Sequence, residues 1–169
     1  MRQTELHTTI TIEQLWHLLE EVKDPEVPVL SIIDLGIVRD VKVDEEKITI
    51  IITPTYSGCP AMDIISMDIR LKLIEKGYRN VVIQQQLSPA WTTDWMTEDG
   101  KQKLKAFGIS PPNPKQQLCT SDMFREEAVE CPHCHSYHTE LISQFSSTAC
   151  KAMYRCLDCK EAFDYFKCH

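Results

Sequence analysis

The sequence predicts an α+β fold, a small helix–strand–strand–helix–strand domain followed by a four-cysteine zinc-ribbon module. Three observations lead to this expectation. Helical and strand hydrophobic patterns alternate over the first 90 or so residues. A proline-rich segment follows at 110–114. Seven of the eight cysteines then lie in the last 51 of the 169 residues. We therefore expect a first domain over 1–109, a linker over 110–125 and the ribbon over 126–169.

A first helix is expected to begin after Thr11. Its hydroxyl can accept a hydrogen bond from a helix-end N–H while Gln14 reaches back, which is a capping box. The turn Asp24-Pro25-Glu26 should end this helix, because proline disfavours helical geometry in the residue before it. The apolar face at helical spacing consists of Ile12, Leu15, Trp16, Leu19 and Val22.

Two β-branched stretches, Ile37–Val43 and Ile48–Thr53, predict a hairpin around a charged loop. A second amphipathic helix should end at Gly77, a helix C-terminal cap. The residues expected to mark its apolar face are Ile64, Met67, Leu71 and Ile74. A third strand should place Val81, Ile83, Gln85 and Leu87 on one face. A short helix near Thr97–Phe107, ended by Gly108, should follow, and the helices should cover one face of the sheet.

Composition narrows the class of function. The formal net charge is −7 and the pI about 5.3, which argues against general binding of nucleic acid, since phosphate contacts need a basic face. No apolar run approaches the length that spans a bilayer. The N-terminal segment is polar and lacks the apolar core of a signal peptide. We expect a cytoplasmic protein with no membrane contact.

Four cysteines form two Cys-x2-Cys pairs with 21 residues between them. Two such turns supply a closed tetrahedral site for structural zinc, and metal would stabilise a module too small to build much core. Iron also suits four sulfur ligands, and free thiols or a disulfide are the remaining alternative. Cys150 and Cys168 are possible additional ligands, and the role of Cys119 stays open. The four predicted ligands are Cys131, Cys134, Cys156 and Cys159.

Cys59 stands apart from the other cysteines in the turn TPTYSGCPAM. Gly58 permits a sharp turn, and Pro60 suits the first turn of a helix. We therefore place Cys59 at a helix N-terminus, where the helix dipole should lower the pKa of its thiol. The alternative is a small buried hydrophobic residue.

The turn containing Asp24 and Glu26 is also ambiguous. Its two carboxylates could accept helix N–H bonds, contact a partner or help to hold a hard cation. The simplest alternative is that this turn only ends the first helix.

Taken together, these stretches resemble the iron–sulfur assembly domain family. DPEVPVLSIIDLGIV (24–38) is similar to its first signature, and the segment containing Thr53, Gly58 and Cys59 is similar to its second, with a reactive cysteine. The resemblance covers about residues 10–90. It implies that Cys59 is a functional thiol supported by Asp24, Glu26, Thr53 and Gly58, and that iron or an iron–sulfur cluster is handled transiently.

The C-terminal half resembles the PaaD family of phenylacetyl-CoA epoxidase systems, through the two Cys-x2-Cys pairs and the segment STACK (147–151). This resemblance implies an accessory subunit of aerobic phenylacetate degradation that assists maturation of the epoxidase. Its partner would be the iron–sulfur reductase subunit or the di-iron oxygenase subunit, and it could form a homodimer. The alternative is a non-catalytic assembly module without iron chemistry.

Residue patterns favour a non-enzymatic role. A di-iron oxygenase core needs Glu-x-x-His motifs, and a flavin or nicotinamide reductase needs a glycine-rich dinucleotide turn. The sequence contains no such glycine-rich turn, and its one Glu-x-x-His, at 130–133, overlaps a Cys-x2-Cys pair and is too few for such a core. A thiol oxidoreductase that uses Cys-x2-Cys is less favoured, since paired turns in one ribbon more often close on a metal.

Overall fold

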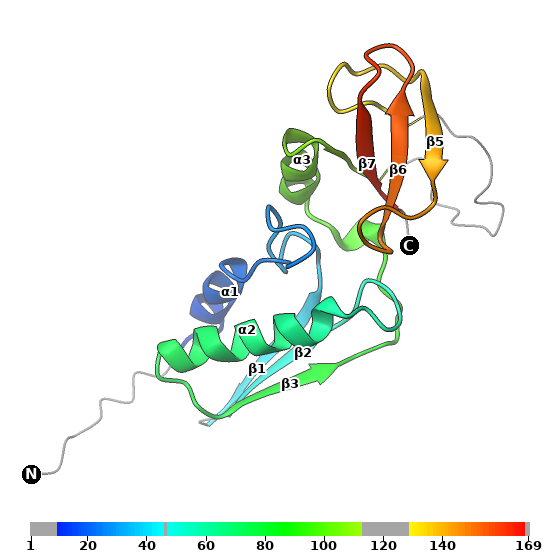
Figure 1. Cartoon of the computed structure of the whole chain (residues 1–169). Coiled ribbons are helices and arrows are strands. Elements are labelled where there is room, and N and C mark those ends of the chain that lie inside the picture. The colour runs from blue at the N-terminus through cyan, green and yellow to red at the C-terminus, as the bar shows by residue number, and fades with distance from the viewer. Residues whose placement is uncertain (1–9, 46, 113–128, 168–169) are drawn as a thin grey trace, which may run out of the picture.

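The computed structural model describes residues 10–45, 47–112 and 129–167 (Figure 1). It confirms an α+β domain followed by a β ribbon. Cys119, Cys168 and most of the predicted linker lie outside the described residues. No helix in the described part of the chain is long and apolar enough to cross a membrane.

The first helix, α1 (Ile12–Glu20), begins as predicted. Thr11 Oγ1 accepts a hydrogen bond from Gln14 N at 3.2 Å, and Gln14 Oε1 accepts one from Thr11 N at 3.0 Å. The capping box is therefore confirmed. The helix ends at Glu20, before the proline turn.

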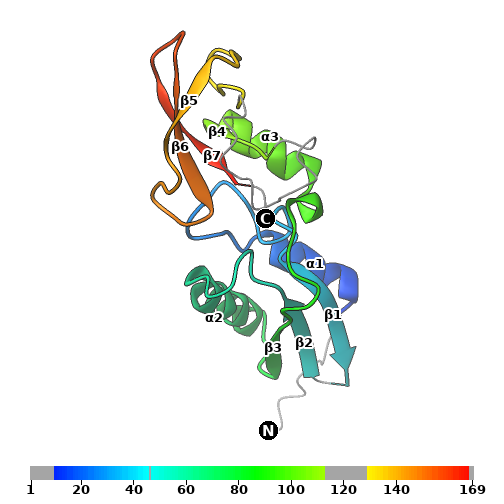
Figure 2. The same cartoon turned by 90° about the vertical axis from the view of Figure 1, so that its right-hand side faces the viewer.

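Three strands form the sheet of the first domain: β1 (Val38–Asp44), β2 (Lys47–Ile52) and β3 (Val81–Gln85). Their order is β1-β2-β3, with β1 antiparallel and β3 parallel to β2. α1 packs on β1, α2 (Ala61–Glu75) packs on β3, and the two helices contact each other (Figures 1 and 2). The core between them includes the alternate β2 side chains Ile48, Ile50 and Ile52. Leu87, expected in β3, lies beyond its end and is exposed.

The prediction of the buried face of α2 was wrong. The four residues expected to pack, Ile64, Met67, Leu71 and Ile74, are all 45–54% exposed. At 100° per residue the helix carries apolar stripes on two opposite sides, so periodicity could not tell which one packs. The buried stripe consists of Ala61, Met62, Ile65, Ile69 and Leu73.

A connecting segment packs against the loop before β1. It contains a short 3-10 turn, η1 (Thr93–Trp95), and the predicted third helix, α3 (Glu98–Ala106). Buried Asp34 joins the two parts, because its carboxylate accepts hydrogen bonds from Ser31 N at 2.9 Å and Lys103 Nζ at 2.9 Å. These hydrogen bonds fix the position of α3 against the loop before β1.

Gly36→Ala is expected to destabilise the first domain strongly. Gly36 has φ +66°, and an added Cβ would lie 2.3 Å from the backbone oxygen of Trp95. Left-handed strain and overpacking together should lower the free energy of unfolding by about 3 kcal/mol. Gly77→Ala is the matched control, since Gly77 has φ +92° but open space around it, and about 1 kcal/mol is expected there. Urea unfolding of both variants measures the difference; equal losses would contradict the steric argument.

The ribbon sheet has the strand order β4-β7-β6-β5. Between the two Cys-x2-Cys pairs, β5 (Thr139–Ser143) and β6 (Lys151–Cys156) form an antiparallel hairpin. Two further strands, β7 (Ala162–Phe166) and β4 (Ile109–Ser110), were not predicted. The two-residue β4 pairs with β7 in parallel, so the chain joins the ribbon sheet directly after α3.

The ribbon is packed against the first domain, as both views show (Figures 1 and 2). Cys150 and Phe166 of the ribbon belong to the core of the first domain. The Phe166 ring lies edge-on to Trp91, with 6.4 Å between centroids. Lys105 Nζ of α3 lies 2.8 Å from Glu130 Oε1. These contacts place ribbon side chains beside the loops that precede β1 and α2.

Candidate functional site

Cys59 lies in the turn between β2 and α2, as the sequence predicts. Gly58 has φ +79°, and Cys59 N donates to Tyr56 O at 3.2 Å, which closes the turn. Pro60 is the N-cap residue of α2. The Cys59 side chain is therefore presented at the first turn of the helix, partly buried but in reach of solvent.

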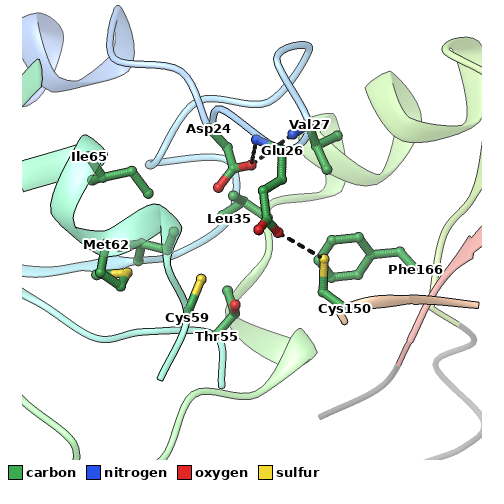
Figure 3. Close-up of a pocket in the computed structure, with 11 residues that line it drawn as sticks. Asp24, Glu26, Val27, Leu35, Thr55, Cys59, Met62, Ile65, Cys150 and Phe166 are labelled. Atoms are coloured by element: carbon green, nitrogen blue, oxygen red, sulfur yellow. Dashed lines mark hydrogen bonds between the residues drawn. The ribbon is translucent and has the colours of Figure 1, made fainter. Parts of the chain in front are cut away.

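Cys59 lines a pocket to which the ribbon also contributes (Figure 3). Asp24 and Glu26 come from the loop after α1, while Cys150 comes from the segment that leads into β6. The sulfur atoms of Cys59 and Cys150 and the Glu26 carboxylate point into the same space (Figure 3). The remaining lining is mostly apolar: Val27, Leu35, Ile37, Thr55, Met62, Ile65 and Phe166.

Asp24 organises the acidic loop. Its side chain is 6% exposed, and Oδ1 accepts hydrogen bonds from Glu26 N and Val27 N, both at 2.8 Å. Burial raises the pKa of Asp24, against the lowering effect of these two bonds and of the nearby Lys151 ammonium. Of the roles left open for this turn, acceptance of backbone N–H bonds is the one that Asp24 fulfils here. It holds Glu26 at the pocket.

The expectation that the helix N-terminus lowers the pKa of Cys59 was wrong. Burial raises the pKa of this thiol above its ordinary 9.0. The Ala61 N–H and the Tyr56 hydroxyl lower it, but they do not outweigh desolvation and the neighbouring Glu26 charge. Cys59 is therefore a protonated thiol at neutral pH, with hydrogen-bond donors ready to stabilise a thiolate once a cation replaces the proton.

Cys150 is the second thiol of the pocket. It is 3% exposed, and its Sγ donates to Glu26 Oε2 at 3.5 Å. Burial, with a contribution from the Glu26 charge, raises the pKa of Cys150 to about 11. The sequence singled out Cys150 as a possible ligand; the structure places it beside Cys59 and outside the group of four paired cysteines.

Alkylation of Cys59 by iodoacetamide should be slow at pH 7 and rise about tenfold per pH unit up to pH 9, because only the thiolate reacts. The raised pKa predicts that the rise continues above 9.0. Mass spectrometry of the peptide containing Cys59 gives the rate, with a small free thiol as the reference. A rate that levels off below pH 8 would show a lowered pKa and contradict the burial argument.

The four paired cysteines form a second cluster, in the ribbon. Their sulfur atoms all lie within 4.8 Å of one another, with Cys131–Cys159 at 3.8 Å and Cys134–Cys156 at 3.5 Å. Four sulfurs at 2.3 Å from one tetrahedral zinc ion would be about 3.8 Å apart. The arrangement therefore fits a single metal ion.

Two matching turns hold these cysteines. Cys131 O accepts a hydrogen bond from His135 N at 2.9 Å, and Cys156 O accepts one from Lys160 N at 3.1 Å. His135 and Lys160 both have positive φ, 62° and 69°, so His135 stands where many zinc turns carry glycine. The Cys159 N–H, 3.5 Å from Cys156 Sγ, and the Asp158 N–H lower the pKa of Cys156 to about 6, whereas desolvation and the neighbouring sulfur atoms raise the pKa of Cys159.

Three further residues near the two sites have more ordinary surroundings. His135 Nδ1 lies 2.8 Å from Glu130 Oε1, and His138 Nδ1 lies 3.0 Å from Asp158 Oδ1. Thr53 does not line the Cys59 pocket. Its buried Oγ1 has no hydrogen-bond partner among the described residues.

The sequence did not predict that Cys59, Cys150 and Glu26 line the same pocket. It also did not single out Tyr56, whose hydroxyl hydrogen-bonds to the Cys59 sulfur. The separation of 91 residues between Cys59 and Cys150 leaves no local signal. The only available hint was that Cys150 falls outside both Cys-x2-Cys pairs.

Two family models match the chain. The model described as "Iron-sulfur cluster assembly protein" matches residues 12–81, which include Asp24, Glu26 and Cys59. The model described as "PaaD zinc beta ribbon domain" matches residues 115–167, which include the four paired cysteines and Cys150. Both confirm the resemblances found in the sequence.

Similar proteins agree with this division. An Escherichia coli (strain K12) protein, named as the putative D component of 1,2-phenylacetyl-CoA epoxidase, is 50% identical over 93% of each chain. A Porphyromonas gingivalis protein named "Fe-S protein maturation auxiliary factor" is 36% identical over 56% of this chain and 90% of its own length. The crystal structure of a Bacillus anthracis domain of unknown function, DUF59, matches with a TM-score of 0.51 and 30% identity over 54% of this chain and 89% of that one.

Proposed function

Because the chain belongs to the PaaD family of phenylacetyl-CoA epoxidase components, we propose that it is an accessory subunit of aerobic phenylacetate degradation. In this role it assists maturation of the multicomponent epoxidase by delivering iron or an iron–sulfur cluster. It does not itself carry out the epoxidation. The proposal includes a cytoplasmic location and, as client, the iron–sulfur reductase subunit or the di-iron oxygenase subunit.

The observation that carries the proposal is the position of Cys59. It lies beside Glu26 and Asp24 in a partly open pocket, within the segment that matches the iron–sulfur assembly model. Thiolate and carboxylate are ligands for iron. A relative of the same domain is named for maturation of iron–sulfur proteins. We assign to this pocket the transient binding of the cargo.

The chain's own residues would control this binding. The Glu26 carboxylate attracts a cation, and Cys59 exchanges its proton for the metal. The Ala61 N–H and the Tyr56 hydroxyl then stabilise the resulting thiolate. Since an unbound Cys59 is protonated at neutral pH, the metal competes with a proton and is held weakly enough to pass on.

The ribbon has a separate role in the proposal. Its four paired cysteines hold structural zinc, which fits the sulfur spacing and the matching ribbon model. The zinc stabilises a small core whose buried members are Val129, Cys131, Ala152, Cys156, Phe163 and Tyr165. The ribbon can then present a rigid surface to the client.

The exposed apolar stripe of α2 favours a second candidate function, an assembly module that binds the oxygenase without iron chemistry. Four large apolar side chains share this stripe, and isolated proteins seldom leave such a set uncovered. The stripe lies on the helix face opposite the buried one, so a partner could cover it without disturbing the core. The residues are Ile64, Met67, Leu71 and Ile74.

Cys59→Ser separates the two functions. The epoxidase subunits are produced with the wild-type chain, with Cys59→Ser, or with no added chain. Iron per client subunit, epoxidation activity and co-purification are then measured. The maturation role predicts that Cys59→Ser still binds its client but leaves client iron at the level found without the chain. Full client iron with Cys59→Ser would contradict iron delivery and leave the assembly role.

A further inference from the structure

We propose that the exposed apolar stripe of α2 docks one amphipathic helix of the client, whose own apolar face is bordered by lysine or arginine. The stripe consists of Ile64, Met67, Leu71 and Ile74. This inference rests on the proposed function only in taking the partner to be the client that receives the iron. It adds the surface that binds the client and the kind of segment that this surface accepts.

The stripe belongs to a firmly seated helix. Ile69 and Leu73, on the opposite side of α2, are fully buried in the core of the first domain, so the helix cannot turn the stripe inward. α2 packs on α1 and β3, and each of the four stripe side chains still stays 45–54% exposed. Single exposed apolar residues are common, but four at the spacing i, i+3, i+7 and i+10 form a continuous patch. Such a patch is typical of an interaction site.

The shape of the stripe suits a helix as its partner. Ile64 and Ile74 are ten residues apart, which is about 15 Å along the helix axis. The stripe is a ridge of side chains that packs into the groove of a second helix. A partner helix of about three turns with apolar residues at the same spacing would cover it. An extended segment fits less well, because the backbone groups of α2 are already hydrogen-bonded within the helix.

The charges beside the stripe select a basic partner. At 100° per residue, Asp63, Asp68, Arg70 and Glu75 lie within about 80° of the middle of the stripe. Asp68 is half-buried and the other three are exposed. Among the described residues, none of the four has an ion-pair partner. Three acids and one arginine leave a negative surplus, which lysine or arginine beside the partner's apolar face would neutralise.

Other occupants fit these charges less well. Lys72, the next cation around the helix, is held in an ion pair with Glu21 of α1. Two copies of the chain that met stripe to stripe would bring the same surplus of acids together in a symmetric contact, and facing like charges oppose association. An anionic membrane surface is disfavoured for the same reason, since helices that lie on membranes carry lysine and arginine on their polar face.

The stripe begins at the end of α2 that carries the Cys59 pocket. Ile64 follows Cys59 by five residues, and this end of α2 lies toward the ribbon (Figure 1). Met62 and Ile65, on the other side of the same turn, line the pocket. A helix docked along the stripe therefore brings the client to the place where the cargo is proposed to bind.

Co-purification of the full chain with the epoxidase subunits tests the stripe. Leu71→Glu places a charge in its middle and should weaken binding of the client by at least about tenfold, as expected for a central interface side chain. Phe107→Glu is the matched control, because Phe107 is 58% exposed at the end of α3, and it should bind like the wild type. Wild-type binding by Leu71→Glu, or an equal loss with Phe107→Glu, would overturn the proposal.

Charge reversal tests the kind of partner and does not disturb the apolar residues. The double variant Asp68→Lys, Glu75→Lys should also bind about tenfold more weakly. The double variant Asp44→Lys, Asp94→Lys makes the same change in net charge on other elements and should bind like the wild type. High salt should weaken wild-type binding and reduce the difference. A reversed stripe that binds as well as the wild type would rule out a basic partner.

Photo-crosslinking from Met67→benzoylphenylalanine identifies the occupant. The chain is irradiated together with the epoxidase subunits, and mass spectrometry locates the crosslinked peptide. The proposal predicts a client segment with helical apolar spacing and lysine or arginine beside its apolar face. Crosslinks only between two copies of the chain, or to an acidic client segment, would contradict it.

The results for Leu71→Glu and Cys59→Ser separate this inference from the maturation role. If Leu71→Glu binds normally while client iron still depends on Cys59, the docking surface is refuted and the maturation role stands. If Leu71→Glu loses the client while Cys59→Ser leaves client iron full, the docking surface stands without iron delivery.

Discussion

Removal of the metal from the four-cysteine site is expected to unfold the ribbon, and Cys156→Ala should do the same. Among the described residues, the ribbon's own core has six buried members, two of which are the predicted ligands Cys131 and Cys156. Binding of structural zinc contributes on the order of 10 kcal/mol to such modules, far more than this core can replace. Unfolding of the ribbon should also remove Cys150 from the lining of the Cys59 pocket.

Hydrogen exchange before and after chelation measures this effect. Amides of β6 and β7 should lose protection, while those of β1, β2 and α2 keep most of theirs, because the first domain has its own core. Cys59→Ala, which lies just before α2 and leaves both Cys-x2-Cys pairs intact, is the control, and its ribbon should be protected like that of the wild type. A ribbon that stays protected without metal would contradict the structural role of zinc.

Asp34→Ala is expected to lower the free energy of unfolding by about 2–3 kcal/mol, the usual cost of leaving buried hydrogen-bond donors without an acceptor. Asp34 is buried, and its loss leaves Ser31 N and the Lys103 ammonium without their carboxylate partner. It also removes the side-chain link between α3 and the loop before β1.

Asp99→Ala provides the matched control. Asp99 Oδ2 is the other partner of Lys103 Nζ, at 2.6 Å, but its side chain is 70% exposed. A surface pair of this kind contributes less than about 1 kcal/mol. Urea unfolding compares the two variants. Similar losses would show that Asp34 does not anchor the segment.

The Asp34 contribution should also depend on pH. Burial alone would raise the pKa of Asp34, but the hydrogen bond from Ser31 N and the Lys103 ammonium lower it below 3.8. A carboxyl with a lowered pKa stabilises the fold above its unfolded-state pKa, and this contribution is lost as pH falls through the folded-state value. The difference between wild type and Asp34→Ala should therefore shrink below about pH 4.

Local signals predicted much of the fold. The capping box at Thr11 and the glycine at the end of α2 appear as expected, because each depends on hydrogen bonds within one turn of the chain. The β1–β2 hairpin also follows from adjacent residues. The four paired cysteines were predictable for the same reason, since each Cys-x2-Cys turn closes on itself.

Features that depend on packing were not predictable in the same way. The packed side of α2 was misassigned because both sides carry apolar residues. The pKa of Cys59 was misjudged because its burial comes from the opposing loops and cannot be read from the turn itself. Cys59 and Cys150 line one pocket because β4 pairs in parallel with β7, and no signal in the sequence predicts this pairing.

The central claim is that the chain handles iron at Cys59 and keeps a different metal in its ribbon. The most direct test loads the wild type and Cys59→Ser with Fe²⁺ anaerobically, removes free metal, and measures iron and zinc per chain. The account predicts about one zinc in both, and iron that is retained by the wild type and lost from Cys59→Ser. Equal iron in the two proteins, or iron that replaces the ribbon zinc, would contradict it.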